Sequence, residues 1–225
     1  MEKVIKLTLD SDKRINIDED NKSHLRNLLS GCRVNLLLGA GFSSNLLGIL
    51  GNKESAFEIL KNIKYKSDDQ LSKRDILTSY LYWSFFQTAI LPIVHKSNVY
   101  ATEFEEYKLF GDNLYRLFSE RSNPVLDRQL NIFTTNYDPI LELIFDCSKK
   151  MVYNDGFEGR IRPYFSTDNF SKSYYRQAVF SNRKAEIPSV NIFKIHGSVT
   201  WDFDPICGEV QYVDYQKNIS EFKKS

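Results

Sequence analysis

Three short apolar runs constrain the fold of this chain more than any other feature. They lie at residues 33–38, 130–135 and 190–195, and each is followed by a turn that carries glycine or polar residues. A continuous apolar run of this length is too short for a lone helix and is typical of a strand buried in a parallel sheet. The carboxyl ends of such strands form the ligand crevice of an open α/β sheet. We therefore predict an α/β fold whose functional groups follow these three runs.

A mostly helical lobe is expected between the first two runs. From residue 55 to about residue 121, apolar residues recur at spacings of three and four, which is the period of an amphipathic helix. The aromatic cluster within the helical segment 71–94 holds more rings than one core-facing stripe can carry. We expect part of this cluster to contact another subunit, so the protein is predicted to form a homo-oligomer.

The remaining segments complete the expected order of elements. We expect strands at residues 4–9, 149–153 and 209–215, a short helix at residues 18–29, and a loop-rich or irregular stretch at residues 154–184.

Composition narrows the class of protein. The 225 residues, 42% of them hydrophobic, can form one domain with a substantial core. The 30 basic and 29 acidic residues nearly balance, so charge favours neither nucleic acid nor a membrane as a partner. The apolar runs fall far short of the roughly 20 residues that span a bilayer, and no export signal opens the chain. Three scattered cysteines indicate a reduced, cytoplasmic protein without a four-cysteine zinc site.

The first candidate site follows the first apolar run. It consists of Gly39, Ala40, Gly41, Phe42 and Ser43. Small residues directly after a strand let backbone N–H groups approach a pyrophosphate, and a following helix N-terminus would add positive potential. An ordinary tight turn from strand to helix explains the same residues. The third glycine of a complete dinucleotide fingerprint is missing, because Ser44 stands there.

The second candidate site follows the second run and contains Thr135, Asn136 and Asp138. Here an amide and a carboxylate would project into the crevice. Both also have structural interpretations: Asp138 suits the N-cap of a helix with Pro139 at its first position, and Asn136 suits a turn.

The third candidate site is the pair His196 and Gly197 after the third run. Histidine is the side chain best suited to exchange protons near neutral pH, although a lone histidine is more often a hydrogen-bonded structural residue. The other two histidines, His24 and His95, lie in helix-like contexts and are assigned structural roles.

Taken in order, the three motifs over residues 34–201 resemble the sirtuin superfamily signature. The resemblance implies a Rossmann-like fold that binds NAD. The loop from Gly39 to Ser43 would hold the pyrophosphate, Asn136 and Asp138 would lie by the ribose and nicotinamide, and His196 would transfer a proton at the ribose. Thr135 and Gly197 belong to the same NAD-binding motifs.

Departures from the deacylase pattern are equally informative. Residues 48–51 lack the Pro-Asp-Phe-Arg segment of sirtuin deacylases, Thr135 replaces a glutamine, and only Cys207 stands where two zinc-binding CxxC pairs are expected. The chain is more similar to zinc-less bacterial sirtuin-like domains that hydrolyse NAD⁺ in antiphage defence. That resemblance implies an NAD⁺ glycohydrolase that uses NAD as its substrate and needs no metal.

The predicted fold class is thus α/β, a Rossmann-like parallel sheet with an inserted mostly helical lobe, incomplete at the C-terminus. One domain spans residues 1–225, with its core at 30–54 and 130–215 and the helical insertion at 55–129. We expect a longer parent protein, in which a C-terminal or separate module senses infection. The alternatives are a catalytically silent module that binds NAD or ADP-ribose, a protein deacylase, and an interaction domain whose motifs only end buried strands.

Overall fold

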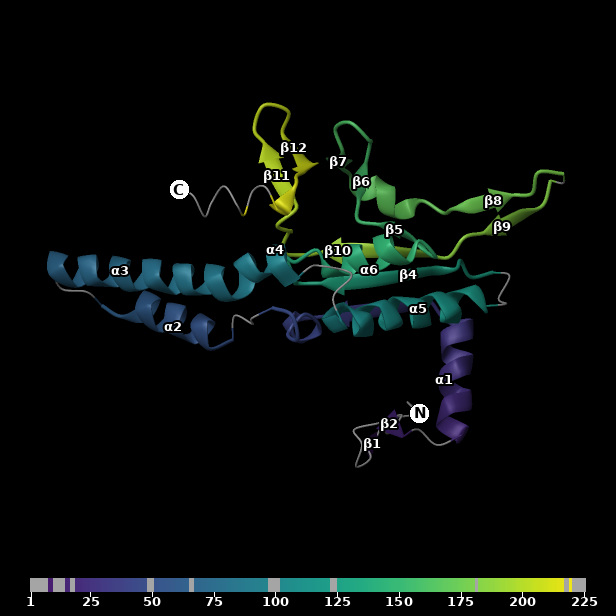
Figure 1. The fold of residues 1–225 in the computed structure, drawn as a ribbon, viewed down its shortest axis with the longest axis horizontal. Coiled ribbons are helices and arrows are strands. Elements are labelled where there is room, and N and C mark those ends of the chain that lie inside the picture. The colour runs from purple at the N-terminus through teal and green to yellow at the C-terminus, as the bar shows by residue number, and fades with distance from the viewer. Residues whose placement is uncertain are drawn as a thin grey trace.

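The centre of the molecule is a four-stranded parallel sheet (Figure 1). In order across the sheet, its strands are β3 (Val34–Leu38), β4 (Gln129–Thr134), β10 (Ser189–Lys194) and β5 (Val152–Asn154). All three strand pairs are parallel, which confirms the predicted α/β, Rossmann-like class. The structure, a computed structural model, describes residues 8–9, 15–16, 19–47, 51–64, 67–96, 102–121, 125–180, 182–216 and 219.

The first apolar run lies at an edge of this sheet rather than in its middle. β3 pairs with β4 from Val34 opposite Leu130 to Leu38 opposite Thr134. Its side chains alternate between half-buried and exposed, and Leu37 is 76% exposed. The prediction of a buried strand is therefore wrong for one of its two faces. The run is apolar along its length, so periodicity alone could not reveal that one face stays open.

One face of the sheet is covered by helices α5 (Glu105–Ser119) and α6 (Ile140–Ser148). We call it the helix-covered face. Four apolar strand residues that point into it are fully buried, namely Leu130, Ile132, Val190 and Ile192, and the half-buried side chains of β3 pack against the same core. The two helices approach so closely at Gly111 that a Cβ there would lie 2.6 Å from Ile144 Cγ2.

The opposite face carries a ladder of four asparagines, one from each strand in register, and we call it the asparagine face. Asn131 Nδ2 donates to Asn35 Oδ1, Asn191 Nδ2 to Asn131 Oδ1, and Asn154 Nδ2 to Asn191 Oδ1, each at 3.0 Å. Such a chain of amide dipoles satisfies buried polar groups that the sheet would otherwise leave unpaired.

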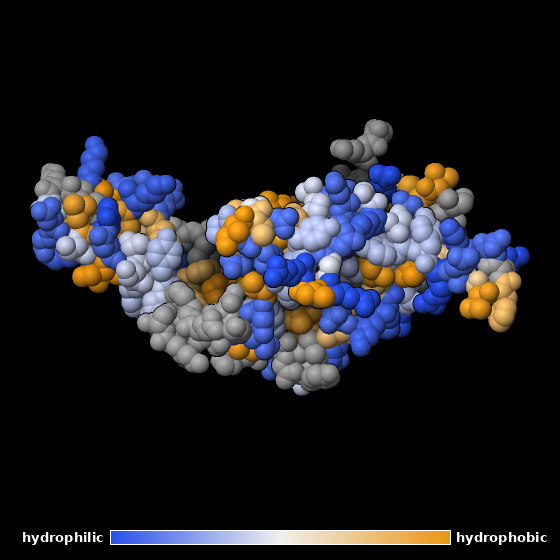
Figure 2. Space-filling view, turned by 90° about the horizontal axis from the view of Figure 1, so that it is seen from above, coloured by the Kyte–Doolittle hydropathy of each residue, from blue (hydrophilic) through white to orange (hydrophobic). Residues whose placement is uncertain are grey.

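The lobe between β3 and β4 is helical, as predicted. It contains α2 (Gly51–Asn62), α3 (Asp68–Phe85), a π-helix (Phe86–Ile90), α4 (Leu91–Lys96) and α5. The α2–α3 hairpin extends away from the sheet (Figure 1). Tyr80, Tyr82 and Trp83 are 66%, 61% and 46% exposed, whereas Phe86 is buried. The rings therefore do not share one core-facing stripe, and apolar side chains reach the surface of this lobe (Figure 2).

A second, smaller sheet stands on the other side of the parallel sheet from α5 (Figure 1). In order, its strands are β11 (Trp201–Asp204), β12 (Glu209–Tyr212), β7 (Tyr164–Phe165) and β6 (Phe157–Glu158). Strand β12 lies inside the stretch 209–215 that was expected to form a strand.

The stretch 154–184 is more regular than predicted. It holds β6, β7, a 3-10 helix (η4, Thr167–Ser171) and β8 (Tyr175–Gln177), which pairs with β9 (Lys184–Glu186) in a hairpin. Strands of two or three residues leave no readable alternation in the sequence, which explains the error. The turns before and after β6 use Gly156 and Gly159, whose φ angles of 88° and 103° favour glycine.

The expected boundaries shift at three further elements. Lys149 adopts a left-handed conformation that ends α6, so β5 begins at Val152 rather than at residue 149. The helix expected at residues 18–29 is α1 (Glu19–Gly31). β1 (Thr8–Leu9) pairs with β2 (Ile15–Asn16), and residues 4–7 of the expected first strand lie outside the described residues. No helix in the described ranges is long and apolar enough to cross a membrane.

Candidate functional site

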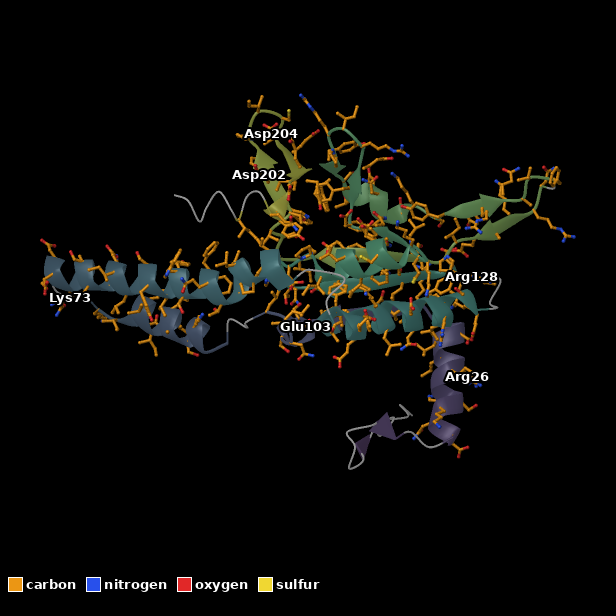
Figure 3. The ribbon with its side chains drawn as sticks, viewed as in Figure 1. Arg26, Lys73, Glu103, Arg128, Asp202 and Asp204 are labelled. Atoms are coloured by element: carbon orange, nitrogen blue, oxygen red, sulfur yellow. The ribbon has the colours of Figure 1, made fainter. Side chains whose placement is uncertain are left out.

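The loops that follow β3, β4 and β10 meet at the carboxyl edge of the parallel sheet. This edge carries all three motifs that the sequence singled out. In Figure 3, Arg128 lies at the amino end of the sheet and Lys73 on the outer part of α3, whereas Glu103, Asp202 and Asp204 lie on the side of the carboxyl edge. The three motifs themselves bring glycines, a buried amide, a buried carboxylate and a histidine to this edge.

The glycine loop is held in place by aromatic contacts with α5. After Gly39 the chain forms a 3-10 turn (η1, Ala40–Phe42). The Phe42 ring meets Tyr107 and Phe110 edge-on at 5.4 and 5.2 Å between centroids, and Tyr107 Oη donates to the Phe42 carbonyl at 2.9 Å. Burial, followed by the nearby charge of Asp138, raises the pKa of Tyr107, so this hydroxyl stays a donor.

The expected helix N-terminus directly behind the loop is not found among the described residues. The short turn of η1 takes its place, and α2 begins only at Gly51. Any anion at this loop would therefore be bound by individual backbone N–H groups and not by a helix dipole. The pattern Gly-x-Gly after a strand indicates close backbone approach but does not specify the type of the next element.

Gly39 and Gly41 leave the loop open. A Cβ on either residue would meet no atom within 4 Å, and neither is among the described glycines with a positive φ. Both are exposed. Neither the local backbone nor its neighbours therefore require glycine at these positions, whereas close approach of a ligand to the backbone would.

Ser43 links the first motif to the second. Asn136 Nδ2 donates to Ser43 Oγ at 2.9 Å, and Ser43 Oγ donates to Asp138 Oδ2 at 2.7 Å. Ser43, Asn136 and Asp138 are buried, with 3%, 7% and 6% of their surface exposed. Ninety-five residues of sequence separate Ser43 from Asp138, so this contact depends on the pairing of β3 beside β4.

Asp138 also has the structural role that the sequence offered as an alternative, shifted by one residue. Its Oδ1 accepts from the Ile140 backbone N–H at 3.0 Å, while α6 begins at Ile140 with Pro139 at the N-cap. The predicted N-cap at Asp138 and first helical position at Pro139 are thus each one residue too early. One carboxylate therefore both starts the helix and binds Ser43. Thr135, the neighbouring member of the motif, is exposed.

The turn that carries His196 is bonded to the second motif on both sides. The Ile195 N–H donates to the Thr134 carbonyl at 2.9 Å, and the Val199 N–H donates to the Tyr137 carbonyl at 2.9 Å. Gly197 has a φ of 80°, which favours glycine there. His196 itself is exposed. The structure thus brings the His196 turn beside the Asn136 segment.

A buried ion pair beneath the site was not anticipated from the sequence. Lys194, the last residue of β10, has a side chain that is 1% exposed; its Nζ lies 2.9 Å from Glu142 Oε1 and also donates to the Asp138 carbonyl. Burial raises the pKa of Glu142, although Lys194 lowers it. Burial likewise raises the pKa of Asp155 nearby. A lysine inside the apolar run 190–195 was the one signal that could have revealed this pair.

The carboxyl part of the chain resembles a known domain family. Residues 130–224 match the family model of the SIR2-like domain. The match covers the second and third motifs and the β10 strand between them, but not the glycine loop. It supports the sirtuin-like resemblance of this segment and an NAD-related activity in general. No curated protein matches the chain. Within the described ranges, no group of three or more His, Cys, Asp or Glu side chains could hold a metal ion.

Proposed function

We propose that this protein hydrolyses NAD⁺ to nicotinamide and ADP-ribose. The observation that carries the proposal is the joining of the three motifs at one sheet edge, where Ser43 bonds both Asn136 and Asp138 and the His196 turn bonds the same segment. Ligands of open α/β sheets bind at the carboxyl ends of the strands. The SIR2-like match at residues 130–224 favours NAD as that ligand.

The glycine loop would bind the pyrophosphate. Its exposed backbone at Gly39, Ala40 and Gly41 can approach a phosphate closely, because glycines 39 and 41 have no side chain and face no neighbour within 4 Å. Ser43 and Phe42 hold this loop to the rest of the site through Asp138 and Tyr107. Thr135 and Gly197 would flank the ribose from the other two loops.

The remaining polar groups suit the chemistry of N-glycosidic cleavage. As the bond from the ribose C1′ to nitrogen breaks, its electron pair goes to the nicotinamide ring, and a water oxygen bonds to C1′. The nicotinamide is already cationic in NAD⁺, so no strong acid is needed to release it. Asn136 and Asp138 would orient ribose and water beside the oxocarbenium-like transition state, and His196 would accept the proton that water loses.

Release of nicotinamide from NAD⁺, without an acyl acceptor, tests this proposal. We expect Asn136→Ala and His196→Ala to lower the rate by about 100-fold or more, the usual effect of losing a positioned proton-transfer or orienting group. His24→Ala is the matched control, because His24 lies on α1 and carries no proposed role. An unchanged rate in His196→Ala, with the variant folded, would contradict the assignment.

Gly41→Ala tests the loop separately from the chemistry. Because a Cβ at this position meets no atom within 4 Å, we expect the fold to remain intact while the affinity for NAD⁺ falls. Gly31→Ala is the control, since Gly31 is equally uncrowded and lies at the end of α1. The assignment of the loop fails if both variants bind NAD⁺ with the affinity of the parent protein.

The second candidate function is a module that binds NAD or ADP-ribose without cleaving it. It is favoured by the exposed side chain of His196, for which no partner that would orient it is found among the described residues. Calorimetry with NAD⁺ alongside the nicotinamide assay separates the two functions. Saturable binding with no release of nicotinamide would select the binding module.

Because the chain resembles antiphage proteins, we also propose that its cleavage of NAD⁺ defends the cell against phage. Cleavage of this kind depletes NAD⁺, and we expect it to arrest infected cells before phage are released. Cells that express the parent protein should give fewer plaques than cells with His196→Ala, and equal plaque counts would contradict the defence role.

A further inference from the structure

An aromatic hollow lies on the asparagine face next to the site, and none of the roles above uses it. It encloses about 330 Å³ and is lined mainly by apolar side chains from β4, β10, the second sheet and η4. Its size lies at the lower end of ligand pockets and suits one part of a ligand rather than a whole dinucleotide.

The walls of the hollow are rings. Phe133 and Phe193 stack at 4.6 Å between centroids, and Phe170 stacks on Phe193 at 4.1 Å. Phe165 and Trp201 close the other side, with their ring centroids 5.0 Å apart. Such surfaces favour a flat ring that can stack or meet them edge-on.

Among the described lining residues, the one charged side chain is directed away from the hollow. Lys194 contributes to the lining, but its ammonium group is bonded to Glu142 and to the Asp138 carbonyl. A phosphate or carboxylate would therefore find no free cation among the lining residues. A weakly polar heterocycle fits this wall, and a pyridinium cation would gain in addition from the aromatic faces.

The hollow borders the His196 turn. Ile195 lines it, and a Cβ at Gly197 would lie 3.8 Å from Trp201 Cε3. The same turn is bonded on its other side to the Asn136 segment. A nucleotide whose ribose lies at His196 can therefore place a ring in the hollow.

We propose that the hollow formed by Phe133, Phe165, Phe170, Phe193, Ile195 and Trp201 is the binding site for a planar nitrogen heterocycle of a nucleotide. The inference rests on the proposed function for the identity of the ligand, an NAD-type dinucleotide, which offers two such rings, nicotinamide and adenine. Both share the flat, weakly polar chemistry that the hollow selects.

Trp201 can report this binding directly. The chain has two tryptophans, and Trp83→Phe leaves Trp201 as the only one while it keeps the ring that stacks on Phe86. We expect saturable quenching of Trp201 fluorescence by nicotinamide mononucleotide or by AMP, and none by ribose 5-phosphate. The mononucleotide that quenches identifies the ring. Quenching by neither, or equal quenching by ribose 5-phosphate, would overturn the proposal.

A variant that fills the hollow with a larger side chain gives an independent test. Thr167 lines the hollow at an exposed position, so Thr167→Phe occupies it without removing a core side chain. We expect about 10-fold weaker binding of the quenching mononucleotide. Thr167→Val, with nearly unchanged volume, should bind as the parent does. Equal affinity in all three proteins would overturn the proposal.

Nicotinamide release, measured in the same proteins, separates this inference from the proposed function. Release of nicotinamide without quenching of Trp201 leaves NAD⁺ hydrolysis standing and removes the ring site. Saturable quenching of Trp201 without release of nicotinamide leaves the ring site standing and removes NAD⁺ hydrolysis.

Discussion

The two faces of the parallel sheet are built from the same strands but by different chemistry. On the helix-covered face, residues such as Ile132 and Ile192 are fully buried against α5 and α6. On the asparagine face, the next residues along the same strands, such as Asn131 and Phe193, form a hydrogen-bonded ladder and a ring stack. Parallel sheets are usually apolar on both faces. Here one face is mainly apolar, and the other combines a ladder of polar amides with aromatic rings.

Contacts on the helix-covered face hold the fold together, whereas the asparagine face leaves surface that a ligand can contact. Burial on the helix-covered face provides most of the stabilising free energy, since that term grows with apolar area removed from water. The asparagine face satisfies its polar groups through the asparagine ladder and the backbone of η4, and its rings surround a hollow rather than a filled core. The two faces should therefore differ sharply in how substitutions change stability.

The largest effect is expected at Lys194, a charged strand residue that is buried on the helix-covered face. Lys194→Met leaves the Glu142 carboxylate buried without its partner and should lower the free energy of unfolding by about 3–5 kcal/mol, measured by urea denaturation. In Glu142→Leu/Lys194→Met both charges are gone, so most of that loss should be recovered. A double variant as unstable as Lys194→Met would show that the lysine acts through packing instead.

The pH dependence of Glu142→Gln checks the same pair. Burial places the pKa of Glu142 above its ordinary value of 4.5, so the glutamate contributes stability that is present below that value and is lost as the pH rises through the folded-state pKa. Glutamine does not titrate. The free energy of unfolding of Glu142→Gln, relative to the parent, should therefore increase as the pH rises above about 4.5, and a flat difference would contradict the raised pKa.

Ile132→Ala tests the apolar part of the helix-covered face. Ile132 is fully buried in the cluster that joins sheet and helices, so truncation should lower the free energy of unfolding by about 2–5 kcal/mol. Ile132→Val, which removes a single methylene, should cost about 0.5–1.5 kcal/mol. Thermal or urea unfolding measures both, and a loss below about 1 kcal/mol in the alanine variant would mean that this face is loosely packed.

Asn191→Ala tests the middle of the asparagine ladder. Asn191 is 2% exposed and bonds the side chains of Asn131 and Asn154, so its removal takes the donor from Asn131 Oδ1 and one of two acceptors from Asn154 Nδ2. We expect a loss of about 1–3 kcal/mol. Asn35→Ala, at the exposed end of the ladder, should cost clearly less, and equal losses at the two positions would show that the ladder is not a connected network.

Leu37→Ala should have the smallest effect. Leu37 lies on the asparagine face of the edge strand β3 and is 76% exposed, so truncation should change the free energy of unfolding by no more than about 0.5 kcal/mol. A loss near that of Ile132→Ala would show that a further layer covers this face in solution and would end the contrast between the two faces.

The placement of the candidate site residues at one sheet edge could be predicted from the sequence because its signals are local. Gly39, Asn136 and His196 each come directly after an apolar run, and strand ends converge in a parallel sheet whatever the strand order. Lys194 and Glu142 could not be paired in the same way, since one ends a strand and the other lies on a helix. Their contact depends on where α6 docks.

The sequence by itself determined the α/β class, the helical lobe and the positions of the three motifs, because apolar periodicity and turn residues act over a few neighbours. Only the tertiary structure decided that β3 is an edge strand, that Ser43 bonds Asp138, that four asparagines form one ladder, and that aromatic rings enclose a hollow beside His196. Each of these depends on register between strands far apart in the chain, and register is set by the packing of the whole sheet.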